Sequence, residues 1–259
     1  LGFLQNLPGA GGDAPSTALA LVLRYDRSGD LKIGGHVLRQ ENGQAYLNPR
    51  SGRARGAKGI VPPGQFRCDM MTKKSHGRTM PPIALPICLL GANVGGRPNY
   101  CTIAWFTMID DEPPTIGLVT AKDRKTKDGI IENRTFSVSL PSTDMVVPVD
   151  HVGTTSGRKE DKSSVFRSFY GRLRTAPMVE ECPLTMECEL KRIVELEGTD
   201  LIIGEIVEVY ADERAYHGKE PDPFILDPLM YLSSAMTYHR LGDRIADAFK
   251  VGSSYRQRN

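Results

Sequence analysis

From Pro81 onward the chain alternates short apolar runs with turns that contain glycine or proline, and this pattern limits the folds open to it. The first three apolar runs are Leu85–Leu90, Tyr100–Thr107 and Thr115–Thr120, each long enough for one strand. The segments NVGGRPN and DDEPP between them are rich in turn-forming residues. Short strands joined in this way favour a meander or a barrel over a parallel sheet.

The second half of the chain continues the β pattern. Further strands are expected at FSVSL, at Leu184–Val194 and at Leu201–Tyr210, with ELEGTD as a hairpin turn between the last two. The segment MYLSSAMTYHRLGDRIADAF is expected to form a strand and then an irregular or helical tail. The pattern therefore indicates a mainly β fold.

Two segments show helical spacing instead. Thr126 is an acceptable N-cap for KDGIIENR, in which Ile130 and Ile131 can face a core. In STDMVVPVDHV, four apolar residues recur at helical spacing, namely Met145, Val146, Val149 and Val152. Pro148 must then lie in the first turn of that helix or mark a break. The polar segment GTTSGRKEDKSS that follows is expected to be a loop.

The first 75 residues differ from the rest in composition. GAGGDAPSTA and NPRSGRARGAKGIVPPG are rich in Gly, Pro, Arg and Ala, and only ALALVLRY and LKIGGHVL could pair, across DRSGD, in a hairpin that would be marginal alone. Three interpretations are open: a disordered leader, a small β appendage, or sequence translated ahead of a start at Met70 or Met71. We favour the first and third, and divide the chain into an N-terminal extension over 1–75 and one domain over 76–259.

Composition and missing motifs exclude several classes of function. Hydrophobic residues make up 40% and charged residues 25% of the chain, as in ordinary soluble domains. The sequence contains no apolar run of about 18 residues, so no membrane-spanning helix is expected. The opening LGFLQNLPGAGG lacks the features of a signal peptide, so a cytoplasmic location is expected. The motifs GxGxxG after a strand, GxxxxGKS/T, HExxH and GxSxG are all missing, which argues against a Rossmann unit, a P-loop, a zinc protease and a serine hydrolase.

Cysteine and histidine usage does not predict a metal site. The cysteines are odd in number and show no CxxC spacing, so reduced thiols are expected at Cys68, Cys88, Cys101, Cys182 and Cys188. The five histidines are scattered along the chain. The basic character of the first residues comes with few aromatic side chains, so nucleic-acid binding is not expected.

A basic stretch precedes the first expected helix. Lys122, Arg124 and Lys125 place positive charge beside Thr126 at the start of that helix. A helix start suits a phosphate, because its first N–H groups lack partners and the helix dipole favours an anion. Basic residues beside a helix are also common on solvated faces, so these residues alone leave both interpretations open.

Several short motifs, taken in order, resemble one known family. The first four are a G-x-P-N turn (Gly96, Pro98, Asn99), a T-x-x-W pattern (Thr102, Trp105), a PP turn (Pro113, Pro114) and a basic stretch ending in Thr (Lys122 to Thr126). An L-P-S tripeptide (Leu140, Pro141, Ser142) and an SGRKEDK loop (Ser156 to Lys162) follow. With APMVEECPLTMECEL and GEIVEVYAD downstream, they resemble the flavin reductase-like, FMN-binding split-barrel family over residues 81–250, and its flavoredoxins most closely. The resemblance implies a mainly β fold, an FMN-binding split barrel (a β-barrel with a few helices), preceded by a poorly structured N-terminal extension.

The resemblance also implies a cofactor site. Lys162 and Thr126 would hold the phosphate of FMN through charge-assisted bonds, and Asn99 and Trp105 would lie along the ribityl chain or ring. Hydroxyl, backbone or charged groups are expected to contribute from Thr102, Thr120, Ala121, Lys122 and Arg124. Ala121 stands where the family often has Arg or Ser, so only a backbone contact is expected there. Structural interpretations are also open: a core Trp105, a turn-forming Asn99 and an exposed Lys162.

The function implied by the resemblance is an NAD(P)H-dependent flavin reductase, in which electrons pass from NADH or NADPH through bound FMN to a flavin or another acceptor. No catalytic side chain and no metal are expected, because the flavin ring carries out the electron transfer. The alternatives are a flavoredoxin-like electron carrier, serving a protein partner without efficient NAD(P)H turnover, and a barrel that shares only the architecture. The resemblance also implies a homodimer, and we expect neither nucleic acid nor membrane as a partner.

Overall fold

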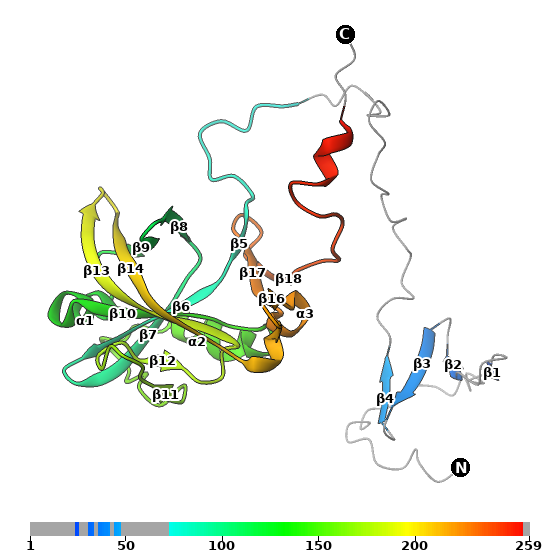
Figure 1. Cartoon of the computed structure of the whole chain (residues 1–259), viewed down its shortest axis with the longest axis horizontal. Coiled ribbons are helices and arrows are strands. Elements are labelled where there is room, and N and C mark those ends of the chain that lie inside the picture. Colours follow the sequence, from blue (N-terminus) through cyan, green and yellow to red (C-terminus); the bar gives the residue numbers. More distant parts are fainter. Residues whose placement is uncertain (1–23, 26–30, 34–35, 42–43, 48–72, 256–259) are drawn as a thin grey trace, which may run out of the picture. The chain divides into compact units, whose positions relative to one another are not determined.

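The computed structural model describes residues 24–25, 31–33, 36–41, 44–47 and 73–255. The chain divides into two compact units, one formed by Leu1–Met71 with Ile245–Asn259 and the other by Thr72–Arg244. Figure 1 colours both along the sequence, from blue to red. In the part of the chain described, no helix is long and apolar enough to cross a membrane.

The described strands of the smaller unit form an antiparallel sheet. They pair in chain order as β1 (Arg24–Tyr25), β2 (Leu31–Ile33), β3 (His36–Glu41) and β4 (Gln44–Leu47). Tyr25 lies opposite Leu31, so the strands expected on either side of DRSGD do pair. Most of the predicted extension over 1–75 lies outside the described residues, and its boundary stays a prediction. The same unit contains the 3-10 helix η4 (Val251–Ser254).

The main element of the larger unit is a seven-stranded antiparallel sheet (Figure 1). Its order across the sheet is β7 (Arg97–Ile103), β6 (Cys88–Val94), β10 (Thr135–Leu140), β13 (Leu184–Glu195), β14 (Thr199–Ala211), β9 (Pro114–Ala121) and β8 (Phe106–Asp111). The two edge strands, β7 and β8, are consecutive in the chain, with only Ala104 and Trp105 between them. The sheet must therefore curl until its edges approach each other, and β7 does lie near β9. The predicted β-barrel is confirmed.

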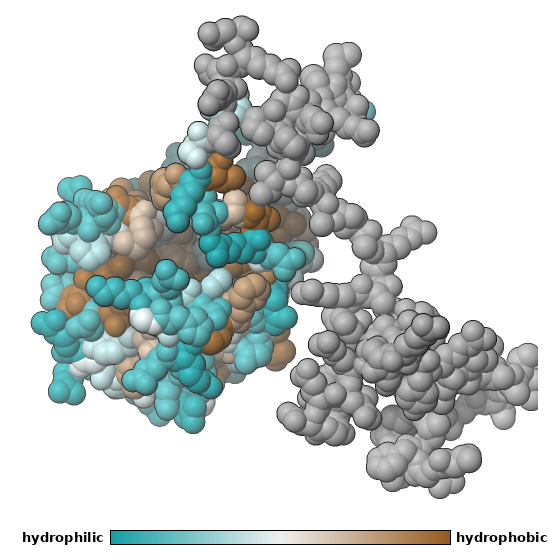
Figure 2. All heavy atoms as spheres, turned by 45° about the vertical axis from the view of Figure 1, so that its right-hand side comes forward, coloured by the Kyte–Doolittle hydropathy of each residue, from teal (hydrophilic) through white to brown (hydrophobic). Residues whose placement is uncertain are grey.

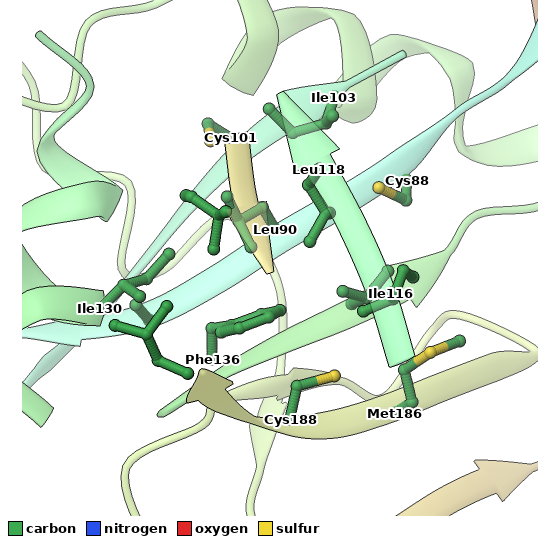
Figure 3. Close-up of a cluster of buried hydrophobic side chains, with 14 residues drawn as sticks. Cys88, Leu90, Cys101, Ile103, Ile116, Leu118, Ile130, Phe136, Met186 and Cys188 are labelled. Atoms are coloured by element: carbon green, nitrogen blue, oxygen red, sulfur yellow. The ribbon is translucent and has the colours of Figure 1, made fainter. Parts of the chain in front are cut away.

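The barrel encloses one hydrophobic core, shown in Figure 3. Every second residue of β6 and β7 points into it, including Cys88, Leu90, Cys101 and Ile103. Phe136 and Ile130, both fully buried, fill the space between the sheet and the first helix. Because these side chains come from strands far apart in sequence, the core fixes the barrel as one unit.

A second core lies on the other face of β6 and β7. Leu89 and Tyr100, which alternate with the residues of the first core, pack here against Val149 and Val152. Tyr100 also packs edge-on against Phe166, with ring centroids 5.5 Å apart. Most of both strands is therefore buried on both faces, which explains the nearly continuous apolar sequence at the start of β6.

Two helices pack against the barrel. The first, α1 (Lys125–Asn133), lies so close to β6 that a Cβ on Gly129 would overlap the carbonyl oxygen of Asn93. The second, α2 (Val146–Thr154), follows the 3-10 helix η2 (Thr143–Met145). Pro148 is the third residue of α2, so of the two alternatives expected for it, the first turn and a break, the structure shows the first turn. The segment after α2 contains no helix or strand up to Ser168, in agreement with the predicted loop.

Three predictions about individual elements were wrong. The run Tyr100–Thr107 is two strands, because the chain must cross from one edge of the sheet to the other at Ala104 and Trp105. Ile131 is 53% exposed, since adjacent helical residues point about 100° apart and Ile130 occupies the core position. The segment starting at Met230 forms a hairpin and not a single strand.

Short elements complete the larger unit. Two-stranded pairs join β11 (Ser168–Phe169) to β12 (Met178–Val179) and β15 (Tyr216–His217) to β16 (Glu220–Pro221). A three-stranded sheet has the order β18 (Thr237–Arg240), β17 (Leu229–Leu232) and β5 (Ala84–Pro86). The 3-10 helix η3 (Glu213–Ala215) and the helix α3 (Pro223–Leu226) connect these pieces after β14.

Candidate functional site

A cavity of about 250 Å³ lies where β7, the end of β9, the start of α1 and the loop after α2 meet. Its walls carry three cationic side chains, one carboxylate, several hydroxyls and a thiol: Asn99, Cys101, Ala121, Asp123, Arg124, Lys125, Thr126, Thr154, Ser156, Gly157 and Lys162. A second hollow of about 220 Å³ shares Asn99, Lys125 and Gly157 with it, so the two adjoin.

The start of α1 forms one wall of the cavity. The helix begins at Lys125, with Arg124 as an extended N-cap residue whose side chain does not cap the helix. Thr126 was predicted to be the N-cap but is the second helical residue, because the helix starts two residues earlier, with Arg124 as its N-cap. The N–H groups of a first turn have no partners within the helix, so this wall favours an anion.

Thr126 is nevertheless well placed to act in the cavity. Its side chain is only 1% exposed, and its hydroxyl oxygen accepts a hydrogen bond of 2.7 Å from the side-chain amide of Asn99. Because the oxygen accepts from Asn99, the hydroxyl hydrogen is left to donate elsewhere. Asn99 and Thr126 thus connect β7 to the first turn of α1 at the floor of the site.

Lys162 reaches the cavity from the loop after α2. Its side chain is 2% exposed, and its ammonium group donates to the carbonyl oxygens of Val152 at 2.9 Å and Thr155 at 3.1 Å. An ammonium group has three donors, so one remains for a ligand. Burial lowers the pKa of Lys162, and the nearby positive charge of Arg124 lowers it further.

Arg124 binds the same end of α2. Its guanidinium group donates to the carbonyl oxygen of Gly153 at 3.2 Å. The last carbonyl groups of a helix carry partial negative charge, so they hold both Arg124 and Lys162 in place. The end of α2 therefore positions two cations at a cavity that α1 lines with its first turn.

The position of the loop after α2 depends on Gly157. A Cβ at this residue would lie 2.6 Å from the side-chain oxygen of Asn99, so only glycine lets the loop approach β7 this closely. Arg158 then fastens the loop to the start of α1, donating to the carbonyl oxygen of Asp123 at 2.9 Å and pairing with Asp128 at 2.9 Å.

Five of the nine predicted site residues line this cavity: Asn99, Ala121, Arg124, Thr126 and Lys162. Lys162 is buried at the site and not an exposed charge. Thr102 is turned away, and its hydroxyl donates to the carbonyl oxygen of Val149 at 2.5 Å, which holds α2 against β7.

The other three predicted residues also lie outside the cavity walls. Thr120 is buried in β9, Lys122 is exposed, and Trp105, between the edge strands, is 42% exposed. Their contact with a flavin, like that of Thr102, stays a prediction.

Sequence reasoning missed several lining residues. Cys101 is the clearest case, because residues two apart in a strand share a face, so Asn99 predicts Cys101 and not Thr102 beside it. Burial raises the pKa of the Cys101 thiol, which makes it a neutral part of the wall. Lys125, Ser156 and Gly157 belong to motifs that the sequence displays, but nothing in the sequence says that these residues face the cavity.

The donor set fits a phosphate group. Three cations, the hydroxyl groups of Thr126 and Ser156, and the first turn of a helix supply donors, against a single carboxylate from Asp123. The hydroxyl of Thr154 already donates to the carbonyl oxygen of Asp150 at 3.0 Å. No group of three or more His, Cys, Asp or Glu side chains able to hold a metal ion exists among the residues described. The cavity is therefore a candidate anion-binding site.

The family model described as "Flavin reductase like domain" matches residues 80–240, more than half of the chain. Among curated proteins, an uncharacterized protein of Escherichia coli, YddH, is 32% identical over 124 residues, which are 46% of this chain and 66% of YddH.

Solved structures are similar over most of their length. Flavoredoxin from Methanosarcina acetivorans is 36% identical with a TM-score of 0.67, covering 71% of this chain and 98% of that one. Flavoredoxin of Desulfovibrio vulgaris (Miyazaki F) is 31% identical with a TM-score of 0.66, covering 70% and 100%. An FMN-binding protein from Thermus thermophilus is 26% identical with a TM-score of 0.57, covering 66% and 95%.

Proposed function

Because this chain belongs to the flavin reductase like domain family, we propose that it binds FMN and passes electrons from NADH or NADPH to a flavin or another acceptor. The observation that carries this proposal is the convergence of Thr126, Lys162 and Arg124 on one cavity. Two flavoredoxins and an FMN-binding protein, which resemble the chain in structure, support it. When bound, FMN would supply the electron-transfer chemistry, so the side chains need only bind and orient it.

The cavity suits the phosphate end of FMN. Its volume of about 250 Å³ lies below the range of roughly 300–1,000 Å³ typical of sites that enclose a whole drug-sized ligand. We assign the phosphate to Lys162, Thr126 and the first-turn N–H groups of α1, with Arg124 adding positive charge. Each of these contacts pairs an anion with a cation or an N–H or O–H donor in a mostly buried setting, where such bonds are strongest.

A flavoredoxin-like electron carrier is the second candidate. Its support is that the structures with 36% and 31% identity to this chain are both flavoredoxins. In this case the chain would keep its FMN and exchange electrons with a protein partner, with little turnover of NADH or NADPH. The same phosphate site serves either function, so the two differ only in the electron donor.

We propose a homodimer as the working assembly. Three large apolar side chains at the edge strand support this: Trp105, Met108 and Ile109 are 42%, 52% and 47% exposed. Figure 2 shows hydrophobic residues among hydrophilic ones on the surface of the larger unit. Light scattering during size-exclusion chromatography would give twice the mass of one chain for a homodimer. A mass equal to that of one chain would contradict the proposal.

A cytoplasmic location is also part of the proposal. Its support is the state of the four cysteines of the larger unit, Cys88, Cys101, Cys182 and Cys188, which are free and buried. Reduced thiols persist in a compartment where disulfides do not form.

The absorbance spectrum of the purified protein tests the proposal. A visible flavin band, present on purification or after adding FMN, is expected. Bleaching of that band by NADH or NADPH without oxygen supports the reductase, and a stable band supports the carrier. A colourless protein that also takes up no added FMN would contradict both.

Substitution of Lys162 tests the site itself. Lys162→Ala is expected to weaken FMN binding at least about tenfold, since a charge-assisted hydrogen bond is worth about 1.5–3 kcal/mol. Lys219→Ala is the matched control, because Lys219 is exposed and lies outside the cavity walls. Equal FMN affinities in the two variants would remove Lys162 from the phosphate site.

A further inference from the structure

A larger cavity of about 820 Å³ lies at the other end of β14. Thr199 at the start of β14 pairs with Ala121, which lines the candidate FMN site, whereas Ala211 at the end of the strand lines the larger cavity. The strand has 13 residues, so the two ends are roughly 40 Å apart along it at about 3.3 Å per residue. The two cavities are therefore separate sites.

The larger cavity has aromatic and apolar walls. Phe169 and Tyr210 meet edge to face there, with ring centroids 5.8 Å apart. Phe224 and Ile225, on the short helix α3, are 71% and 40% exposed at its rim. The volume falls within the range of about 300–1,000 Å³ that is usual for small-molecule sites. Surfaces of this kind bind an apolar body, and exposed aromatic rings add attraction for a cation.

The charged residues of this cavity are mostly acidic. Two guanidinium groups, from Arg167 and Arg214, face five carboxylates: Asp144, Glu180, Glu181, Asp212 and Asp227. Arg214 is bound to Asp212 at 3.0 Å, and Arg167 to Glu181 at 3.3 Å, so both cations are already paired. Asp227 is paired in turn with Arg240 at 2.6 Å, so three cations are set against five carboxylates and the net charge at the cavity is negative.

The thiol of Cys182 lies in the wall of this cavity, near the carboxylates of Glu181 and Asp144. Cys182 is 7% exposed and lines the cavity. Burial raises the pKa of this thiol, and the carboxylates of Glu181 and Asp144 raise it further. These two carboxylates therefore lie close enough to the buried thiol to act on it together.

We propose that this cavity binds a small organic cation, a protonated amine carried on an apolar, preferably aromatic, body. The ammonium group would lie between Asp144 and the carboxylates of Glu180 and Glu181, which share the single cation of Arg167. The apolar body would lie against Phe169, Tyr210 and Phe224. The phosphates of FMN and of NADH or NADPH are repelled by the same charge, so this is not a second nucleotide site. The proposal goes beyond the flavin function and stands whether or not FMN is bound.

Three probes of one size separate charge from apolar contact. The full-length protein is titrated by calorimetry at low ionic strength with phenethylamine, which is protonated at neutral pH, with the neutral 2-phenylethanol and with the anionic 3-phenylpropionate. Phenethylamine is expected to bind at least about fivefold more tightly than either, because a partly exposed ion pair contributes on the order of 1 kcal/mol. Equal binding of the three probes, or no binding of phenethylamine, would overturn the proposal.

Variants locate the binding to this cavity. Asp144→Asn and Phe224→Ala, both at exposed side chains, are expected to weaken phenethylamine binding severalfold, the first by removing charge and the second by removing apolar surface. Glu197→Gln removes an equally exposed carboxylate in the turn between β13 and β14, outside this cavity, and is the matched control. Unchanged affinity in both cavity variants, or an equal loss in the control, would place the binding elsewhere and defeat the proposal.

Discussion

The side-chain amide of Asn99 in β7 donates a hydrogen bond of 2.7 Å to the hydroxyl of Thr126 in the first turn of α1. Both side chains are nearly inaccessible to solvent, 5% and 1% exposed. The bond links the barrel to the helix start and leaves the hydroxyl hydrogen of Thr126 to face another acceptor. In the proposed function, that acceptor is the phosphate of FMN.

Thr126→Val removes the hydroxyl and keeps the shape of the side chain. FMN affinity is expected to fall at least about tenfold, the effect of losing one hydrogen bond to a charged group, worth about 1.5–3 kcal/mol. The free energy of unfolding is expected to fall by about 1–2 kcal/mol, since the amide of Asn99 loses a buried partner. Fluorescence quenching of FMN measures the first effect and urea denaturation the second.

Thr107→Val is the control for this substitution, because Thr107 is exposed in β8 and its hydroxyl bonds only to the neighbouring carbonyl of Met108. A Thr126→Val protein that binds FMN as tightly as this control would show that the hydroxyl does not touch the cofactor.

Much of the barrel could be predicted from the sequence, because two alternating patterns act together. Apolar residues at every second position predict strands, and Gly or Pro between them predicts turns, so β9, β13 and β14 were located well. The run Leu85–Leu90 is instead divided between β5 and β6, and β6 extends to Val94. The break at Ala104 and Trp105 could not be predicted, since it follows from which strands are neighbours in space. Local sequence carries no information on that order.

The candidate site was predictable in part for the same reason. Asn99, Thr126 and Lys162 belong to recognisable motifs, and the structure brings all three to one cavity. Thr102 belongs to the same motif region but points to α2, because strand geometry sends neighbouring residues to opposite faces. A resemblance to a motif identifies candidate site residues. The direction in which each side chain points depends on the helix, strand or loop that carries it.

Gly157→Ala is expected to weaken FMN binding more than it lowers stability. The added Cβ would lie 2.6 Å from the side-chain oxygen of Asn99, so the loop that carries Lys162 must move away. Overpacking of this kind costs about 1–3 kcal/mol, which the loop can relieve by shifting Lys162 at the expense of the phosphate site. The measurement is FMN affinity together with the denaturation midpoint.

Gly198→Ala is the matched control, because a Cβ there meets no atom within 4 Å. If Gly157→Ala bound FMN as well as Gly198→Ala, the position of this loop would not matter for the cofactor.

Glu187→Ala is expected to destabilise the larger unit strongly. Glu187 is fully buried and accepts hydrogen bonds from the amides of Arg172 and Leu173 at 2.8 and 2.7 Å and from the hydroxyl of Tyr210 at 3.0 Å. Loss of the acceptor leaves three donors at partly buried positions without their partner, and the summed cost is about 3 kcal/mol. Thermal and urea denaturation should show the loss.

Glu189→Ala, two residues further along β13, removes an exposed carboxylate and should change stability little. A similar loss of stability in both variants would mean that the buried bonds of Glu187 are not the cause.

The buried ammonium of Lys162 predicts opposite effects of alkaline pH on FMN binding and on the stability of the protein without FMN. In the unfolded chain Lys162 titrates at its ordinary pKa of 10.5, and burial lowers that pKa in the fold. Between the two values the unfolded chain holds more protons, so the contribution of Lys162 to the free energy of unfolding rises with pH. FMN affinity falls over the same window, because the phosphate loses its cationic partner.

Lys162→Met keeps the length and apolar stem of the side chain without the charge, so it isolates both effects. FMN affinity and urea stability are measured for the two proteins from about pH 7 to 10.5, and the difference between them removes the titration of tyrosines and other lysines. As the pH rises, the FMN affinity of the wild type should fall toward that of Lys162→Met. Over the same range, the free energy of unfolding of the wild type should rise relative to that of Lys162→Met. Parallel curves for the two proteins in both measurements would show that Lys162 neither titrates in this range nor holds the phosphate.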